Sequence, residues 1–171
     1  MNDTVIPQAL PQDAEAIMQL LVACRQDMLS RGIRQWVEHY PTAAAVEATM
    51  ADTFVVRLDG KIVATVTLNE QGEQQYETVR WLTPLRQRAL VVHRLAVHPR
   101  YQRRGLARRL MQFAERLAME RGLASIRLDS FSGNPAALAL YEGLGYTRMG
   151  EVRFPHRDLS FVCFEKVLRL G

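Results

Sequence analysis

Residues 95–107 combine features suited to binding a phosphate group. They read LAVHPRYQRRGLA, which predicts the end of a buried strand, a turn and a long helix from Gly105. The first N–H groups of a helix have no internal partner, and the helix dipole adds partial positive charge at that end. Gly105 and the small Ala107 allow a ligand to approach the backbone closely. The segment therefore predicts a phosphate or pyrophosphate site, although it matches neither the P-loop nor G-x-G-x-x-G.

Arginine carries nearly all of the positive charge, and five arginines lie within ten residues at 100–109. The chain has 22 Lys and Arg against 18 Asp and Glu, a formal net charge of +4, and only Lys61 and Lys166 are lysines. The guanidinium group suits bidentate phosphate recognition. An anionic ligand, a nucleic acid and a solvated helix face are the three interpretations of this cluster. Its members are Arg100, Arg103, Arg104, Arg108 and Arg109.

Two motifs together resemble the GNAT N-acetyltransferases. L-A-V-x-P at 95–99, followed by Q-x-x-G-x-A at 102–107, resembles the acetyl-CoA motif of that family. Residues 134–146 resemble its second motif, N-x-x-A-x-x-x-Y-x-x-x-G-[FY], about 32 residues further on. The order of elements also fits, so the resemblance covers nearly the whole chain. C-F-E-K at 163–166 resembles a bacterial subgroup of this family with poorly defined acceptors.

The resemblance implies an acyltransferase that uses acetyl-CoA as acetyl-donor cosubstrate and no metal. An amine acceptor would attack the thioester directly in a ternary complex, and whether the acyl group is strictly acetyl stays open. The pyrophosphate would lie on N–H groups of residues 103–107, and the pantetheine arm would pair along 95–97 as an added strand. The predicted CoA contacts are Leu95, Ala96, Val97, Gln102, Arg103, Arg104, Gly105, Leu106, Ala107, Arg108, Asn134 and Tyr141.

Tyr141 is the predicted general acid. It matches the position at which the family usually protonates the leaving thiolate, whose unperturbed pKa is about 8.5. A packing role is the alternative, since Leu138 lies on the same helix face. Asn134 is expected to hold CoA and also to cap its helix. The resemblance assigns the oxyanion donor to a backbone N–H near Ala96 or Val97.

The group that removes the proton from the ammonium acceptor is less certain from the sequence. Several family members use a glutamate of the central strand, but residues 90–97 offer no carboxylate. His93 is the predicted base on that strand, because its unperturbed pKa near 6.5 suits the task. A structural role for His93 is the alternative. An ordered water also remains open as the base, as do the carboxylates Glu70, Glu73, Glu77, Asp129 and Glu151.

Aromatic residues in two predicted loops are the candidates for acceptor binding. Trp36 lies in the segment 31–40, and Tyr76 and Trp81 lie in the polar segment 69–88. Aromatic rings line amine sites by cation–π contact. The alternative is that each ring anchors its loop on the core. The acceptor is expected to be a small-molecule or peptide amine, and its identity stays open.

The elements that must position these residues alternate along the chain. The pattern predicts one α/β (α+β) domain over 1–171, with a mixed, mostly antiparallel sheet of six to seven strands and about four helices. Asp59-Gly60 predicts a tight hairpin turn. Helices are expected near 11–32, 42–50, 104–121 and from 135 to Gly143 or Gly145. Strands are expected near 4–6, 54–58, 62–68, 90–97, 126–129, 146–152 and 161–168.

Other functional classes receive less support from the sequence. A non-catalytic acyl-CoA-binding or sensor module is the main alternative, because the central strand lacks a carboxylate. Nucleic-acid binding is disfavoured, since the arginines fall where a CoA turn belongs. No apolar run approaches the roughly 20 residues of a membrane span, and two cysteines are too few for a disulfide framework. We expect a cytoplasmic protein with neither nucleic-acid nor membrane partners, and a homodimer stays open.

Overall fold

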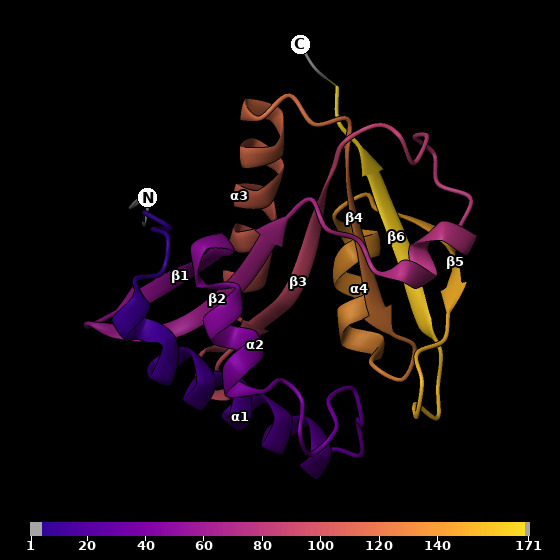
Figure 1. The fold of residues 1–171 in the computed structure, drawn as a ribbon. Helices are drawn as coiled ribbons and strands as arrows, with labels where there is room; N and C mark the ends of the chain where they lie inside the picture. Colours follow the sequence, from indigo (N-terminus) through magenta and orange to yellow (C-terminus); the bar gives the residue numbers. More distant parts are fainter. Residues whose placement is uncertain (1–4, 170–171) are drawn as a thin grey trace. The chain divides into compact units, whose positions relative to one another are not determined.

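A computed structural model describes residues 5–169 as one six-stranded sheet with four α-helices (Figure 1). The strand order is β1-β2-β3-β4-β6-β5. Strand β4 is parallel to β3 and antiparallel to β6, and the pairs β1–β2 and β5–β6 are antiparallel. The predicted mixed, mostly antiparallel fold is therefore confirmed. The elements are α1 (Ala14–Ser30), α2 (Ala43–Ala48), β1 (Thr53–Leu58), β2 (Lys61–Asn69), β3 (Ala89–Val97), α3 (Leu106–Glu120), β4 (Ser125–Phe131), α4 (Pro135–Gly143), β5 (Thr147–Val152) and β6 (Phe161–Val167).

The described chain divides into two compact units. The first unit comprises the residues through Leu68 together with His93–Phe113. The second unit comprises Asn69–Val92 together with the residues from Ala114 onward. Strand β3 and helix α3 each contribute residues to both units.

The first unit is built on the β1–β2 hairpin and on α1. Asp59 and Gly60 have φ values of 49° and 75°, the positive angles that a tight hairpin turn requires. Thr42 caps α2 by accepting a hydrogen bond of 3.1 Å from the Ala45 N–H. One face of α1 is buried in a core with side chains from α2, β1 and β3. That core contains Ile17, Leu20, Leu21, Cys24, Met28, Trp36, Val46, Val55 and Ala96.

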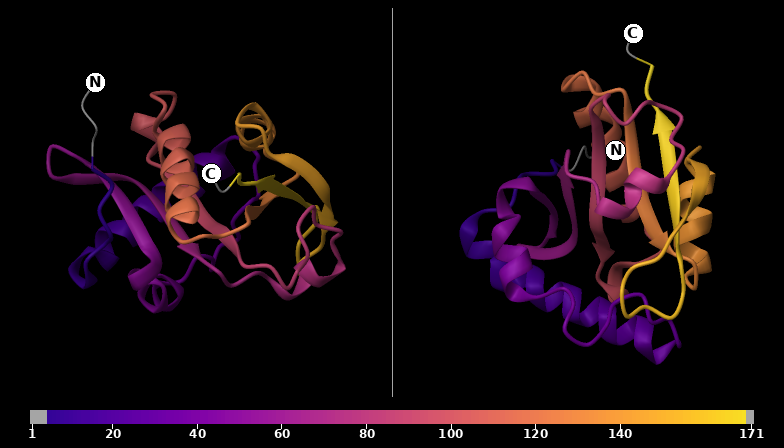
Figure 2. Two further views of the ribbon diagram at one scale, coloured as in Figure 1. Left: turned by 90° about the horizontal axis from the view of Figure 1, so that it is seen from above. Right: turned by 45° about the vertical axis from the view of Figure 1, so that its right-hand side comes forward.

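The second unit has two differently covered sheet faces. The register of β4 and β6 pairs Arg127 with Glu165, and directly opposed residues share a face of the sheet. Asp129 lies two residues along β4 and therefore points to that same face. Phe164 points to the other face, where the ring of Tyr141 from α4 lies 5.6 Å away. Figure 2 shows the consequence: α4 covers one face of β4 and β6, and the segment 69–88 runs along the other.

The boundaries differ from the sequence prediction at a few places. The strand predicted at 4–6 is wrong: Thr4 lies outside the described residues, Val5 and Ile6 are not in a strand, and an isolated bridge forms instead between Gln8 and Phe54. The helix expected from Arg104 begins at Leu106, because positive φ angles precede it. The segment 69–88 carries a 3-10 helix at Gln74–Thr78. None of the helices within residues 5–169 has the length and apolar character needed to cross a membrane.

Candidate functional site

Within residues 5–169, the backbone N–H groups of 103–108, where the turn after β3 leads into α3, donate no hydrogen bond to another backbone group. The Gln102 side chain donates a hydrogen bond of 3.1 Å to the carbonyl oxygen of Val97, which closes the turn onto the strand end. Arg103 and Gly105 have φ values of 61° and 78°. The Arg109 N–H bonds to the Gly105 carbonyl at 3.0 Å and is the first to do so in α3. The N–H groups in the preceding helical turn therefore remain available to an anion.

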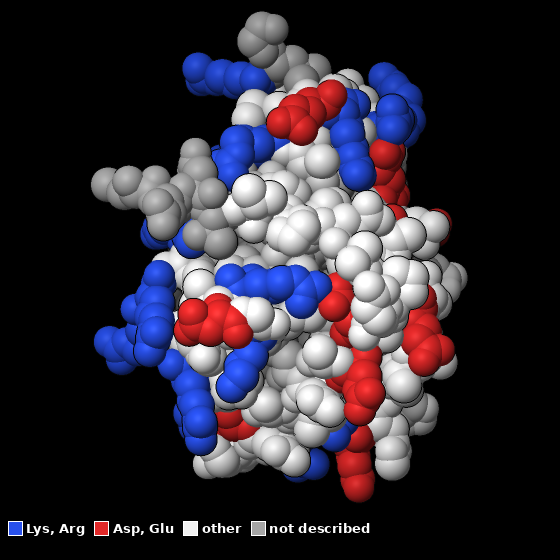
Figure 3. All heavy atoms as spheres, turned by 90° about the vertical axis from the view of Figure 1, so that its left-hand side faces the viewer, with Lys and Arg blue, Asp and Glu red and all other residues white. Residues whose placement is uncertain are grey.

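Open space and positive charge surround this turn. Nothing in the described protein lies within 4 Å of the point where a Cβ on Gly105 would stand. Arg103, Arg104 and Arg108 are exposed, and the Arg104 guanidinium lies 5.2 Å from the centre of the Tyr101 ring. These groups suit a phosphate-bearing ligand. Figure 3 shows acidic side chains interspersed with basic ones on the face that it draws, rather than one continuous basic surface.

Strand β3 itself is held tightly where it enters the turn. The Cys24 thiol donates to the Val97 carbonyl oxygen at 3.2 Å, and burial raises the pKa of Cys24 to about 12. The Arg94 guanidinium donates hydrogen bonds to the hydroxyls of Thr49 and Thr67. His93, the base predicted on this strand, is half-buried and interacts with other groups of the chain.

The second motif lies in the second unit, on α4. The Asn134 side chain accepts a hydrogen bond of 3.2 Å from the Ala137 N–H, so its capping role is confirmed. Tyr141 is only 7% exposed, and its ring packs against Tyr146 and Phe164. Burial and then the negative charge of Asp129 raise the pKa of Tyr141 far above its usual value. Its hydroxyl therefore stays protonated at neutral pH, as a general acid must be.

Asp129 emerges as a titratable group within electrostatic range of Tyr141. The residue is half-buried, and its carboxylate accepts a hydrogen bond of 2.6 Å from the Tyr76 hydroxyl. Burial is the largest influence on its pKa and raises it; the Tyr76 hydrogen bond lowers it, Glu73 raises it and Arg157 lowers it. The resulting pKa of Asp129 is about 6. A carboxyl group that titrates there is suited to accept a proton near neutral pH.

The sequence had named Asp129 only among several open carboxylates. One signal pointed to it: Ser125, Arg127 and Asp129 alternate with apolar residues on β4, so three polar side chains share one face of a buried strand. Buried polar side chains need partners, but the sequence did not identify those partners.

The three aromatic residues predicted for acceptor binding are held within the chain. Trp36 is 7% exposed and belongs to the core around α1, which fits the anchoring alternative. Trp81 packs against Tyr76 with ring centres 5.0 Å apart, and its N–H donates to the Tyr76 carbonyl oxygen at 2.9 Å. Tyr76 also lines a cavity of about 310 Å³. Other residues around that cavity include Glu70, Glu73, Glu77, Val91 and Arg127.

The sequence of the chain matches known acetyltransferases. The model of the "Acetyltransferase (GNAT) family" matches residues 15–146. The chain is 28% identical over 148 residues to the uncharacterised N-acetyltransferase YesJ of Bacillus subtilis (strain 168). The aligned region covers 83% of this chain and 81% of YesJ. It is 44% identical over 52 residues to the ribosomal protein bS18-alanine N-acetyltransferase of Escherichia coli (strain K12), covering 30% of this chain and 35% of that protein.

A solved structure shows the same fold. The GNAT-family acetyltransferase from Streptococcus agalactiae 2603 matches with a TM-score of 0.83 and 24% identity, covering 96% of this chain and 95% of that one.

Among residues 5–169 of the present structure, no group of three or more His, Cys, Asp and Glu side chains is arranged to hold a metal ion.

Proposed function

Because the chain belongs to the GNAT family of acetyltransferases and is thus an acyltransferase, we propose that it transfers the acetyl group of acetyl-CoA to an amine. The observation that carries this proposal is that the second unit holds two suitable titratable groups, Asp129 and Tyr141, and that the charge of the first raises the pKa of the second. One is a carboxyl group with a pKa of about 6, and the other is a buried phenol that stays protonated. Acetyl transfer to an ammonium ion needs one group of each kind.

The turn after β3 is the proposed binding site for the acetyl donor, acetyl-CoA. The N–H groups of residues 103–107 would accept the pyrophosphate of CoA, and Arg103, Arg104 or Arg108 would offset its charge. The edge of β3 at 95–97 would pair with the pantetheine arm. The open space around the position of an added Cβ on Gly105 supports the assignment of the pyrophosphate to this turn.

The proposed reaction uses one proton acceptor and one proton donor. Asp129 takes a proton from the ammonium group, and the freed amine attacks the thioester carbon. The resemblance to the family assigns stabilisation of the oxyanion that forms to a backbone N–H near Ala96 or Val97. The carbon–sulfur bond then breaks, and Tyr141 gives its proton to the departing thiolate. The attacking nitrogen loses its second proton as the intermediate collapses, and that proton restores the Tyr141 hydroxyl. The products are the N-acetyl compound, CoA and the proton that Asp129 then releases to solvent.

The release of CoA thiol tests the proposal. Acetyl-CoA is offered with a panel of small amines, amino acids and peptides with a free N-terminus, the last chosen because of the bS18-alanine relative. Thiol release that requires one class of amine supports the enzyme. Binding of acetyl-CoA without release for any amine would instead support the non-catalytic acyl-CoA-binding module.

Replacing Tyr141 by Phe is expected to lower turnover by about 10²-fold, since general acid catalysis contributes at least that much. The affinity for acetyl-CoA should change little, because the ring and its packing against Phe164 remain. Single-turnover kinetics with a thiol-reporting dye measure the chemical step. Near-wild-type turnover in that step would return Tyr141 to the packing role.

Replacing His93 by Gln separates the two candidate bases. If Asp129 is the base, this variant keeps the acidic limb of the kcat/KM profile near pH 6. The pH dependence of kcat/KM is measured from pH 5 to 9. Loss of that limb in a normally folded variant would assign the base to His93, as the sequence first suggested.

A further inference from the structure

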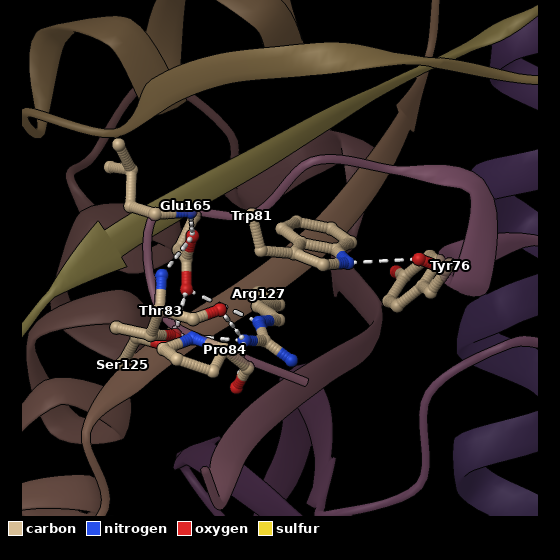
Figure 4. A network of polar contacts seen from close by, with 8 residues as sticks. Tyr76, Trp81, Thr83, Pro84, Ser125, Arg127 and Glu165 are labelled. Carbon is tan, nitrogen blue, oxygen red and sulfur yellow. Dashed lines mark hydrogen bonds and ion pairs between the residues drawn. The ribbon is translucent and has the colours of Figure 1, made fainter. Parts of the chain in front are cut away.

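A buried polar cluster fastens the segment 69–88 to strands β4 and β6 (Figure 4). Glu165 is fully buried, and one of its carboxylate oxygens accepts hydrogen bonds from Ser125 at 2.7 Å and from Arg127 at 3.2 Å. The Thr83 hydroxyl donates to the same oxygen, and the Leu82 N–H donates to the other. A buried carboxylate is tolerated only when its oxygens are paired in this way.

Arg127 completes the attachment from the opposite side of the cluster. Its guanidinium donates to the carbonyl oxygen of Thr83 at 2.7 Å and to that of Pro84 at 3.3 Å. The same group lies 4.9 Å from the centre of the Trp81 ring. The backbone at residues 82–84 and the Trp81 ring are therefore fixed relative to β4.

Trp81 in turn contacts Tyr76 and limits its movement. The indole N–H donates to the Tyr76 carbonyl oxygen at 2.9 Å, and the two rings are in contact (Figure 4). Tyr76 is 4% exposed, and its hydroxyl donates to Asp129 at 2.6 Å. A continuous set of contacts thus runs from the Arg127–Glu165 pair to the carboxylate of Asp129.

We propose that Tyr76 is the positioning residue for Asp129, and that the Arg127–Glu165 cluster exists to hold it there. This inference rests on the proposed function, in which Asp129 is the base. A hydrogen bond to one carboxylate oxygen fixes the rotation of the group and leaves the other oxygen to meet an ammonium ion. It also favours the ionised carboxylate against the effect of burial.

Several other groups face Asp129 and contribute to its titration. Glu73, from the same segment as Tyr76, opposes ionisation, and Arg157, between β5 and β6, favours it. Cys163 lies directly opposite on β6, and burial raises its pKa to about 12, so it stays uncharged. The Tyr141 hydroxyl on α4 is also uncharged. Among the described neighbours that shift the pKa of Asp129, Tyr76 is the one that does so through a side-chain hydrogen bond, at 2.6 Å.

The test compares Tyr76→Phe with Tyr146→Phe. Both changes remove a phenol hydroxyl that faces a carboxylate in the second unit, since Tyr146 donates to Glu115 at 3.4 Å. The pKa of Asp129 is followed by ¹³C NMR of its carboxyl carbon, without substrate. Tyr76→Phe should raise that pKa by about 0.5 to 1 unit and move the acidic limb of kcat/KM upward equally. Tyr146→Phe should move neither.

Trp81→Phe is a second, milder variant that keeps an aromatic ring and removes the N–H bond to Tyr76. It should shift the Asp129 titration in the same direction by less, and it serves if Tyr76→Phe does not fold. An unchanged titration in a folded Tyr76→Phe, or in Trp81→Phe when the first is unfolded, overturns the positioning role. If Asp129→Asn keeps wild-type activity, the proposed base has failed instead, whatever Tyr76 does to the titration.

Discussion

Asp129→Asn is expected to lower kcat/KM by about 10³-fold and to abolish its acidic limb near pH 6. Asparagine keeps the size and the acceptor oxygen for the Tyr76 hydroxyl but cannot take a proton. General base catalysis raises the rate by about 10²- to 10⁴-fold, and the variant loses that contribution. Steady-state kinetics from pH 5 to 9, with the acceptor found in the amine panel, measure both effects.

The same variant should be more stable than the wild type above pH 6. The pKa of Asp129 is about 6 in the folded chain and about 3.9 when unfolded. The stability that the neutral carboxyl contributes is therefore complete below pH 4 and is lost as the pH rises through 6. Asparagine is always neutral, so the gain at pH 8 should be about 1–2 kcal/mol, reduced from the full shift by partial exposure. Urea unfolding at pH 4 and pH 8 measures it. A variant that loses both stability and activity would show a structural role.

Gly105→Glu is expected to abolish the stabilisation that acetyl-CoA gives to the folded protein. At 100 times its dissociation constant, a ligand adds about 2.7 kcal/mol to the wild type. Glutamate places bulk and negative charge where the phosphates are proposed to lie, and it strains a backbone with φ of 78°. Thermal unfolding with and without millimolar acetyl-CoA measures the effect.

Gly60→Glu is the matched control for this experiment. Gly60 has φ of 75°, and it too has nothing within 4 Å of an added Cβ, so the strain and the space are alike. It lies in the β1–β2 turn, away in sequence from the proposed phosphate site. The control should keep the acetyl-CoA shift. Equal loss of the shift in both variants would mean that strain, not phosphate contact, explains the result at Gly105.

Local patterns were sufficient to predict most of the fold. The hairpin at Asp59-Gly60, the helix cap at Asn134 and the strand–turn–helix around Gly105 depend on residues close together in sequence. Such features follow from backbone angles and capping. The strand predicted at 4–6 is misplaced, because the contact with β1 forms a few residues later: the Val55 N–H donates to the Pro7 carbonyl oxygen and the Ala9 N–H to that of Thr53.

Contacts between distant residues set the limit of the prediction for the site. Tyr76 and Asp129 are 53 positions apart, and Arg127 and Glu165 are 38 apart. From the sequence, Tyr76 could be named only as an aromatic candidate and Asp129 only as one of several carboxylates. The register of β4 and β6 brings Arg127 to Glu165, and the course of the segment 69–88 brings Tyr76 to Asp129.

The burial of both cysteines has a practical consequence for every assay described above. Burial raises the pKa of Cys24 and of Cys163 to about 12, so roughly 10⁻⁵ of each is thiolate at pH 7. The chain has no other cysteine. Disulfide dyes that detect CoA should thus give a low background with the folded enzyme. A slow rise in dye signal without substrate would then report unfolding, and a single cysteine introduced at an exposed site should accept a fluorophore selectively.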